Sequence, residues 1–192
     1  MNAMRQSKGQ VNSVVTYIAL LRGINVGGNN KIDMKQLKIA FDDYGFSQVR
    51  NYINSGNVVF SSDKDAAQVQ GDCETLIFER FNLKISVAIL TAGELADALN
   101  HAPGWWGKMP DIRHNAIFVI PPTTVEEVCA DVGEIKPEYE KYTCYGKLIF
   151  WSAPTETFSR TRWGTVSKRE IYQKITVRNS NTVYKLAELA GG

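Results

Sequence analysis

The residues best suited to bind a ligand lie in the stretch LLRGINVGGNNKID, residues 20–33. Eight of the ten residues from Arg22 to Lys31 are Arg, Lys, Gly or Asn. Glycines let backbone N–H groups approach a phosphate, and a helix that starts at Asp33 would add partial positive charge. Arg22 or Lys31 would neutralise the anion. We therefore expect an anion-binding loop, whose candidate binding residues are Arg22, Asn25, Gly27, Gly28, Asn29, Asn30 and Lys31.

A purely structural interpretation of this loop is the alternative. Its spacing is not that of a P-loop, because the GK[ST] ending and the four-residue gap are missing, and it is not GxGxxG. A long connection would need positive φ at Gly27 and Gly28, with Asn side chains bonded to their own backbone. The sequence favours neither interpretation over the other.

A second Asn-rich motif, NYINSGN, lies around a predicted hairpin turn. Its amide and hydroxyl groups orient a polar ligand well but transfer protons poorly at neutral pH. A plain β-turn explains Ser55 and Gly56 better. Asn51 falls within a strand, where Asn is depleted, so it is the stronger candidate for a hydrogen bond to a ligand or within the fold. The candidate binding residues here are Asn51, Asn54, Ser55 and Asn57.

A third motif, TVRNSNT, precedes the last predicted helix. Asn179 or Asn181 would cap that helix through its side-chain oxygen. Arg178 needs another explanation, because a cation at a helix start opposes the helix dipole unless an anion offsets it. We expect Arg178 to pair with an acid or to bind a phosphate, and Arg178 and Asn179 complete the candidate binding residues.

The sequence shows no recognisable catalytic machinery. His101 and His114 stand near no Ser or Cys nucleophile motif and have no metal-ligand spacing, so we interpret both as surface or loop residues. The cysteines, Cys73, Cys129 and Cys144, are too few and too far apart for a disulfide framework or a zinc site, which suggests reduced core residues. No metal site is predicted, and catalytic residues and cofactors stay unassigned.

The N-terminal half of the sequence predicts the element order βαββαβ. Val14–Leu21 is an apolar, β-branched run typical of a central strand. A helix follows, capped by Asp33 with Gln36 and ended by Gly45. The later elements are a hairpin of 48–53 and 58–62, a helix with apolar positions from 69 to 81, a strand over 85–90, and an extra helix capped by Thr91 and Glu94.

The C-terminal half repeats this order. It comprises a strand over 116–120, a helix capped by Thr123 and Glu126, a hairpin of 140–145 and 148–151, a weakly amphipathic helix near 166–174, a strand over 175–177 and a final helix. The fold class is therefore α+β, with two ferredoxin-like βαββαβ halves, each followed by an extra helix. The predicted boundaries are a flexible N-terminal extension over 1–13, a first half over 14–103, a joint over 104–114 packed by Trp105 and Trp106, and a second half over 115–192.

This topology would bring two of the motifs together. A βαββαβ unit of this kind places its first and third strands side by side and antiparallel. The end of the first strand, with Arg22, then meets the turn that opens the third strand. We expect Arg22, Asn54 and Asn57 to surround a shared polar pocket at one sheet edge.

Composition is that of one large or two small globular domains, with 192 residues, 44% hydrophobic, 22% charged and a net charge of +2. Positive charge concentrates near both ends of the chain around an acidic middle, which suggests an anionic partner or a solvated charged face. No run approaches the roughly 18 apolar residues of a membrane span, and no secretory signal is present. A cytoplasmic protein without a membrane partner is expected.

Three motifs in this order, LLRGINVGGNNKI, YINSGNVVF and TVRNSNTVYKL, resemble the bacterial "domain of unknown function 1697" (DUF1697) proteins. The similarity spans most of the chain. The resemblance implies an α+β fold with ferredoxin-like halves and brings no established reaction, cofactor or substrate. The chain departs from the family at Ser180, where an aromatic residue is more common.

The leading hypothesis is a protein that binds a phosphorylated small molecule or a nucleic-acid backbone through its Arg, Gly and Asn-rich loop. One alternative is an enzyme acting on a phosphorylated or nucleotide-like substrate, with Arg22 and Lys31 stabilising charge and Asn51 orienting the substrate. Another is a structural module, because a ferredoxin-like half leaves one sheet face open to pack on its twin or, in a homodimer, on another copy.

Overall fold

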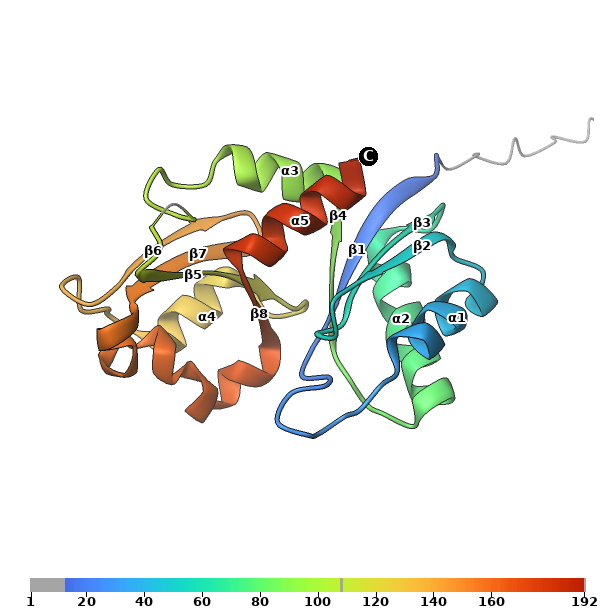
Figure 1. Ribbon diagram of the computed structural model, residues 1–192, viewed down its shortest axis with the longest axis horizontal. Helices are drawn as coiled ribbons and strands as arrows, with labels where there is room; N and C mark the ends of the chain where they lie inside the picture. The colour runs from blue at the N-terminus through green and yellow to red at the C-terminus, as the bar shows by residue number, and fades with distance from the viewer. Residues whose placement is uncertain (1–12, 108, 192) are drawn as a thin grey trace, which may run out of the picture.

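The computed structural model describes residues 13–107 and 109–191. The predicted extension over 1–13 lies outside the described residues apart from Ser13. The chain forms two lobes, each a β-sheet with helices on its outer side, and two further helices lie where the lobes meet (Figure 1). None of the described helices is long and apolar enough to cross a membrane.

The N-terminal lobe is an antiparallel sheet in the strand order β2-β3-β1-β4 with three helices. Its described elements are β1 (Val15–Leu21), α1 (Met34–Tyr44), β2 (Ser47–Tyr52), β3 (Asn57–Ser62), α2 (Ala66–Phe81), β4 (Val87–Thr91) and α3 (Ala92–Asn100). The central strand β1 pairs with β3 and β4, so that Tyr17 lies opposite Phe60. The predicted neighbourhood of the first and third strands is confirmed.

Local signals in the sequence set these elements. The apolar run of β1 is buried from Tyr17 onward, as expected for a strand covered on both faces. Asp33 accepts hydrogen bonds from first-turn amides of α1, and Gly45 ends this helix in the left-handed conformation at φ 103°. Thr91 and Glu94 form the predicted capping box of α3.

The C-terminal lobe repeats the strand arrangement in the order β6-β7-β5-β8. Its described elements are β5 (Ile112–Val119), α4 (Val125–Val132), β6 (Lys141–Tyr145), β7 (Leu148–Pro154), the 3₁₀ helices η1 (Thr155–Arg160), η2 (Trp163–Lys168) and η3 (Glu170–Lys174), β8 (Ile175–Asn179) and α5 (Ser180–Gly191). The strand order is the same in both lobes, and α3 and α5 follow them. The α+β fold with two ferredoxin-like halves is therefore confirmed.

The crossover from β7 to β8 differs from the prediction. Short 3₁₀ helices replace the α-helix expected near 166–174. An amphipathic α-helix needs apolar residues every three to four positions to bury one face. In this stretch only η2 has buried side chains, those of Trp163 and Val166, while η1 and η3 have none. The segment therefore follows the sheet surface in single turns.

Two element starts in the C-terminal lobe also differ. β5 begins at Ile112 rather than at Ala116, because the polar residues before Ala116 pair with β7. The helix α4 is capped by Thr124 rather than by Thr123. The sequence offers two overlapping capping boxes one residue apart, and the structure uses the second.

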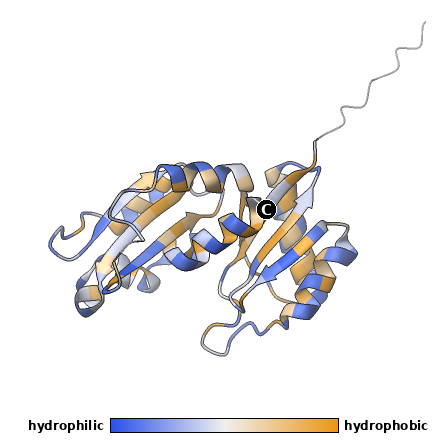
Figure 2. Ribbon diagram, turned by 45° about the horizontal axis from the view of Figure 1, so that its top comes forward, coloured by the Kyte–Doolittle hydropathy of each residue, from blue (hydrophilic) through white to orange (hydrophobic). Residues whose placement is uncertain are grey.

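Hydrophobic clusters bind the layers together. One packs the N-terminal sheet on α1 and α2, and another packs the C-terminal sheet on α4 and the 3₁₀ helices. A further cluster joins the opposite faces of both sheets through α3 and α5, including Leu20 and Phe118. Trp106 packs edge-on against Phe150 there, with 4.9 Å between ring centres. The faces that a ferredoxin-like half leaves open are thus packed within one chain, and hydrophobic residues run along the strands of both sheets (Figure 2).

Candidate functional site

Arg178 is a buried cation that holds the two lobes together. Its side chain extends from β8 and is only 8% exposed. Nε donates to Asn57 Oδ1 at 2.6 Å, and Nη2 donates to the carbonyls of Leu21 and Ser55, each at 2.9 Å. Nη1 donates within β8, to Thr176 Oγ1 and to the Val177 carbonyl. All five N–H donors of the guanidinium are therefore engaged by neutral oxygens.

The environment of Arg178 corrects the expectation that this residue pairs with an acid. Within the described part of the chain, no Asp or Glu carboxylate forms a salt bridge with Arg178. Burial lowers its pKa to about 10. The sequence could not reveal this role, because the carbonyls that replace an acid belong to residues far away in the chain.

Asn57 is committed to the same contact. It is fully buried, its Oδ1 accepts from Arg178, and its Nδ2 donates to the Tyr52 carbonyl at 3.0 Å and to Ser55 Oγ at 2.9 Å. Asn57 and Ser55 thus shape the turn between β2 and β3, and Arg178 caps this turn from the other lobe.

Arg22 takes a different direction from the one expected. Its Nε donates to the Tyr172 carbonyl at 3.0 Å, and the guanidinium lies 5.0 Å from the centre of the Tyr172 ring. The prediction that Arg22, Asn54 and Asn57 surround a shared pocket is therefore wrong, although the predicted pairing of the first and third strands is confirmed. Arg178 occupies the place beside the turn that the sequence analysis gave to Arg22.

The Asn side chains of the loop after β1 mostly hold their own backbone. Asn25, at φ 53°, accepts from the Ile32 amide and donates to the carbonyls of Ile32 and Asn54. Asn30 donates to the Gly23 carbonyl at 3.1 Å. Gly27 and Gly28 have positive φ, of 60° and 81°. These hydrogen bonds and backbone angles agree with the alternative interpretation, in which Asn side chains stabilise the loop itself.

Part of the loop remains available to a ligand. Asn29 and Lys31 are exposed, and a shallow cavity of about 420 Å³ is lined by residues including Gly28, Lys31 and Asn54. Asp33 also lines this cavity, and its carboxylate accepts hydrogen bonds from the Lys35 and Gln36 amides in the first turn of α1. The partial charge of this helix start is therefore already neutralised by the chain.

Asn51 stabilises the start of α1 from the neighbouring strand. Its Nδ2 donates to the Met34 carbonyl. Its Oδ1 is buried and has no hydrogen-bond partner among the described residues. The structure thus places Asn51 as a contact between β2 and α1.

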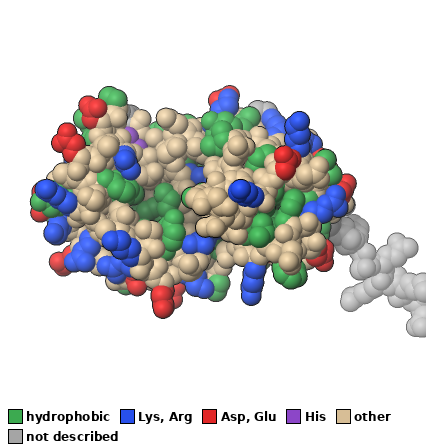
Figure 3. Space-filling model, turned by 60° about the horizontal axis from the view of Figure 1, so that its bottom comes forward, with side chains coloured by type: hydrophobic (Ala, Val, Ile, Leu, Met, Phe, Trp, Pro, Cys, Tyr) green, Lys and Arg blue, Asp and Glu red, His purple; other side chains and the backbone are tan. Residues whose placement is uncertain are grey.

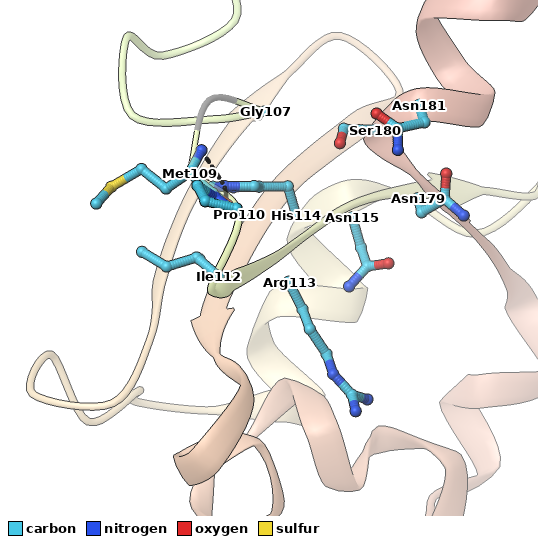
Figure 4. A pocket seen from close by; sticks show the side chains of 10 residues that line it. All are labelled: Gly107, Met109, Pro110, Ile112, Arg113, His114, Asn115, Asn179, Ser180 and Asn181. Carbon is cyan, nitrogen blue, oxygen red and sulfur yellow. Dashed lines mark hydrogen bonds between the residues drawn. The ribbon is translucent and has the colours of Figure 1, made fainter.

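A cavity that the sequence does not predict lies at the start of α5. β5 pairs with β7 from Ile112, but pairs with β8 only from Asn115, because β8 ends at Asn179 and turns into α5. The free edge at the start of β5 and the first turn of α5 line a cavity of about 520 Å³, called here the α5 pocket (Figure 4). This volume lies within the range of about 300–1,000 Å³ found for ligand sites.

Polar groups from α5 enter this pocket. Of the two predicted caps, Asn179 and Asn181, the helix uses Asn179, whose Oδ1 accepts from the Thr182 amide at 2.8 Å. The amides of Ser180 and Asn181 precede the first intrahelical bonds and stay free to donate. Ser180 is only 7% exposed, its hydroxyl points into the pocket (Figure 4), and it has no hydrogen-bond partner among the described residues.

The opposite wall of the α5 pocket comes from β5. Arg113 is exposed, and its guanidinium lies 4.5 Å from the centre of the Phe158 ring. Asn115 adds a side-chain amide. None of the described residues that line the pocket carries a carboxylate. The pocket therefore combines a cation, amides and a hydroxyl, which together favour an anion.

His114 is neither at the surface nor in a loop, so the expectation for this residue is wrong. It lies buried in β5, with Nδ1 2.6 Å from Ser152 Oγ and Nε2 3.2 Å from the Met109 amide nitrogen. Burial lowers its pKa. The alternation of His114 with Ala116 and Phe118 was the signal that could have placed it on the inner face of a strand.

The cysteines are reduced, but only Cys73 is a core residue. Cys129 is half-buried in α4 and Cys144 is exposed on the edge strand β6, so the core interpretation is wrong for Cys144. Their sulfur atoms lie 3.6 Å apart. Within residues 13–107 and 109–191, no three His, Cys, Asp or Glu side chains gather as a metal site would require.

Comparisons with known proteins agree with the fold and leave the activity open. The chain is similar to a solved structure described as "the structure of conserved bacterial protein SP0830 from Streptococcus pneumoniae", with 30% sequence identity and a TM-score of 0.84. The alignment covers 93% of this chain and 99% of that one. No curated protein matches. The model of a protein family of unknown function, DUF1697, matches residues 14–150, and the chain therefore belongs to the DUF1697 family.

Proposed function

We propose that this protein binds a phosphorylated small molecule and that the phosphate sits at the start of α5. The observation that carries the proposal is the Ser180 hydroxyl, which faces the pocket beside the first amides of α5 and has no protein hydrogen-bond partner among the described residues. A hydroxyl that faces a cavity and donates to no protein group can donate to an oxygen of a bound ligand.

The chemistry of the pocket supports an anion over other ligands. Helix amides and hydroxyl groups donate to phosphate oxygens, and Arg113 adds the full positive charge that a phosphate requires. The side-chain amides of Asn115 and Asn181 can donate to the remaining oxygens. The described pocket lining lacks a carboxylate, whereas the cavity beside Lys31 contains one.

The proposal is tested by calorimetric titration of the protein with inorganic phosphate. We expect binding in the wild type and a loss of about 10- to 100-fold in affinity for Arg113→Ala, because one charge-assisted hydrogen bond contributes about 1.5–3 kcal/mol. Ser180→Ala should weaken binding less. Arg50→Ala is the matched control, because Arg50 is an exposed arginine on β2 in the other lobe. Equal affinity in Arg113→Ala and Arg50→Ala would refute the site.

A nucleic-acid backbone is a second candidate ligand, and it would contact another face. The loop after β1 and the 3₁₀ helices lie on the same side of the molecule (Figure 1), and this face carries Lys and Arg side chains on both sides of a central hollow (Figure 3). Exposed cations on these segments without a salt bridge among the described residues are Lys31, Arg160, Arg162, Lys168 and Lys174.

Binding to a nucleic acid would have a distinct dependence on salt and on mutation. Affinity would fall steeply with salt as counterions are released. Lys31→Ala would weaken a gel shift and leave phosphate binding at the α5 pocket unchanged, while Arg113→Ala would do the reverse. A protein that shifts neither DNA nor RNA at low salt would exclude this second candidate. The exposed loop residues Gly27, Gly28 and Asn29 are further proposed contacts to this nucleic-acid backbone.

A further inference from the structure

A second cavity adjoins the α5 pocket and has the opposite chemistry. It encloses about 260 Å³ and is called here the Trp105 cavity. Met109, Ile112 and His114 line both cavities, so the two cavities lie next to each other. The segment before β5 and the first residues of β5 therefore contribute to both sites.

The walls of the Trp105 cavity suit a flat, largely apolar group. Trp105 and Tyr139 are half-buried aromatic residues of its lining, and Pro137 and Pro154 add rigid apolar surface. Aromatic side chains bind rings by stacking and by edge-to-face contact, and Trp and Tyr lose little conformational entropy in doing so. A ring system fits this cavity better than a flexible chain.

Charge distinguishes the two cavities. Glu140 lines the Trp105 cavity with a buried carboxylate that accepts from Trp151 Nε1 at 3.0 Å and from the Trp163 amide at 3.2 Å. Glu138 is a second acid in this lining. An anion is repelled there, whereas the described lining of the α5 pocket contains Arg113 and no carboxylate. A ligand with one anionic end would therefore bind in a single orientation.

We infer that the ligand class is a nucleoside monophosphate, with its phosphate in the α5 pocket and its base in the Trp105 cavity. This inference rests on the proposed function, because it takes the phosphate site at the start of α5 as given. It adds the aromatic half of the ligand. The sugar would then lie beside Met109, Ile112 and His114, which both cavities share.

The experiment compares inorganic phosphate, adenosine and adenosine monophosphate by calorimetry on the whole protein. We expect adenosine monophosphate to bind at least about tenfold more tightly than phosphate, as base stacking on an aromatic residue provides. Adenosine alone should bind weakly. The nucleotide should also change the tryptophan fluorescence, because Trp105 is only half-buried and faces the ligand.

Variants locate the base. Trp105→Leu keeps an apolar side chain and removes the aromatic face, so it should abolish the advantage of adenosine monophosphate while phosphate binding stays at the wild-type value. Tyr139→Leu tests the same cavity if Trp105→Leu fails to fold, which its melting curve would show. Tyr44→Leu, on α1 of the other lobe, is the matched control and should change neither affinity.

The outcomes separate this inference from the function on which it rests. Equal affinities for phosphate and adenosine monophosphate would overturn the nucleotide assignment and leave the phosphate site standing. An advantage of adenosine monophosphate that survives in both Trp105→Leu and Tyr139→Leu would overturn the placement of the base. Binding of none of the three compounds would overturn the phosphate site itself.

Discussion

Replacement of Arg178 by Met should destabilise the whole chain, because it removes the contact that joins the two lobes. The variant keeps the apolar stem of the side chain and deletes the guanidinium. Asn57 Oδ1 and the carbonyls of Leu21 and Ser55 then lose their donor. Asn57 and Leu21 are fully buried in the wild type and Ser55 is half-buried, so water reaches the first two freely only if the lobes separate.

The magnitude follows from the number of bonds and from the burial of the charge. A hydrogen bond that involves a charged group contributes about 1.5–3 kcal/mol, and Arg178 makes three such bonds to the other lobe. Removal of the buried cation also removes its desolvation penalty, which offsets several kcal/mol. A net loss of about 3–5 kcal/mol is expected, which for a chain of this size lowers the melting temperature by roughly 10 °C.

Urea denaturation followed by circular dichroism measures this loss. Arg178→Lys should lose about half as much, because an ammonium keeps the charge but cannot bridge Asn57 and both carbonyls at once. Asn57→Ala should couple with Arg178→Met, so that the double variant loses less than the two single losses added together. A loss under about 1 kcal/mol in Arg178→Met, or strict additivity, would refute the role of Arg178 as the contact between the lobes.

Three further predictions concern single sites. Burial lowers the pKa of His114, so the unfolded chain binds a proton before the folded chain does as pH falls below about 6.5. The free energy of unfolding should therefore fall between that pH and the lowered pKa. Urea titrations at pH 5 and 7 should show a smaller fall in His114→Gln. Hydrogen peroxide should convert the thiols of Cys129 and Cys144, whose sulfur atoms are 3.6 Å apart, to a disulfide with release of water. The bond closes a 15-residue loop and should raise the free energy of unfolding by about 3 kcal/mol, so we expect a loss of two hydrogens by mass spectrometry and a higher melting temperature. The same mass loss in Cys129→Ser would exclude this pairing. Gly56→Ala should lower the free energy of unfolding by about 3 kcal/mol, because Gly56 has φ +73° and an added Cβ would lie 2.8 Å from Leu21 Cβ. Gly28→Ala should lower it by only about 1 kcal/mol in the same assay, because the space around Gly28 is open.

The parts of the fold that depend on local sequence could be predicted. The strand β1 follows from an unbroken apolar run, and the starts of α1 and α3 follow from Asp33 and from the pair Thr91 and Glu94. The repeat of strand order follows from the repeat of these local patterns. The crossover after β7 could not be predicted correctly, because weak amphipathicity does not distinguish an α-helix from successive 3₁₀ turns.

The candidate site depended on contacts that the sequence does not reveal. The sequence marks Arg178 as a cation unusually placed before a helix start, but it does not reveal the partners of this side chain, which lie up to 157 positions away. The α5 pocket arises because Asn115 pairs with Asn179, which fixes where β8 stops along β5. That register is a tertiary property, and it leaves Arg113 on the stretch of β5 that β8 does not cover, where it lines the α5 pocket.

The order of synthesis gives the contact between the lobes a further consequence. The helix α5 packs on β1 and β3, and Arg178 follows its partner Asn57 by 121 positions. At about 5–20 residues per second, the ribosome supplies these residues on the order of ten seconds after the N-terminal lobe has emerged. During that interval the inner face of the first sheet, with Ile18 and Val59, has no α5 to cover it. The nascent N-terminal lobe therefore exposes an apolar sheet face, which favours aggregation until α5 covers it.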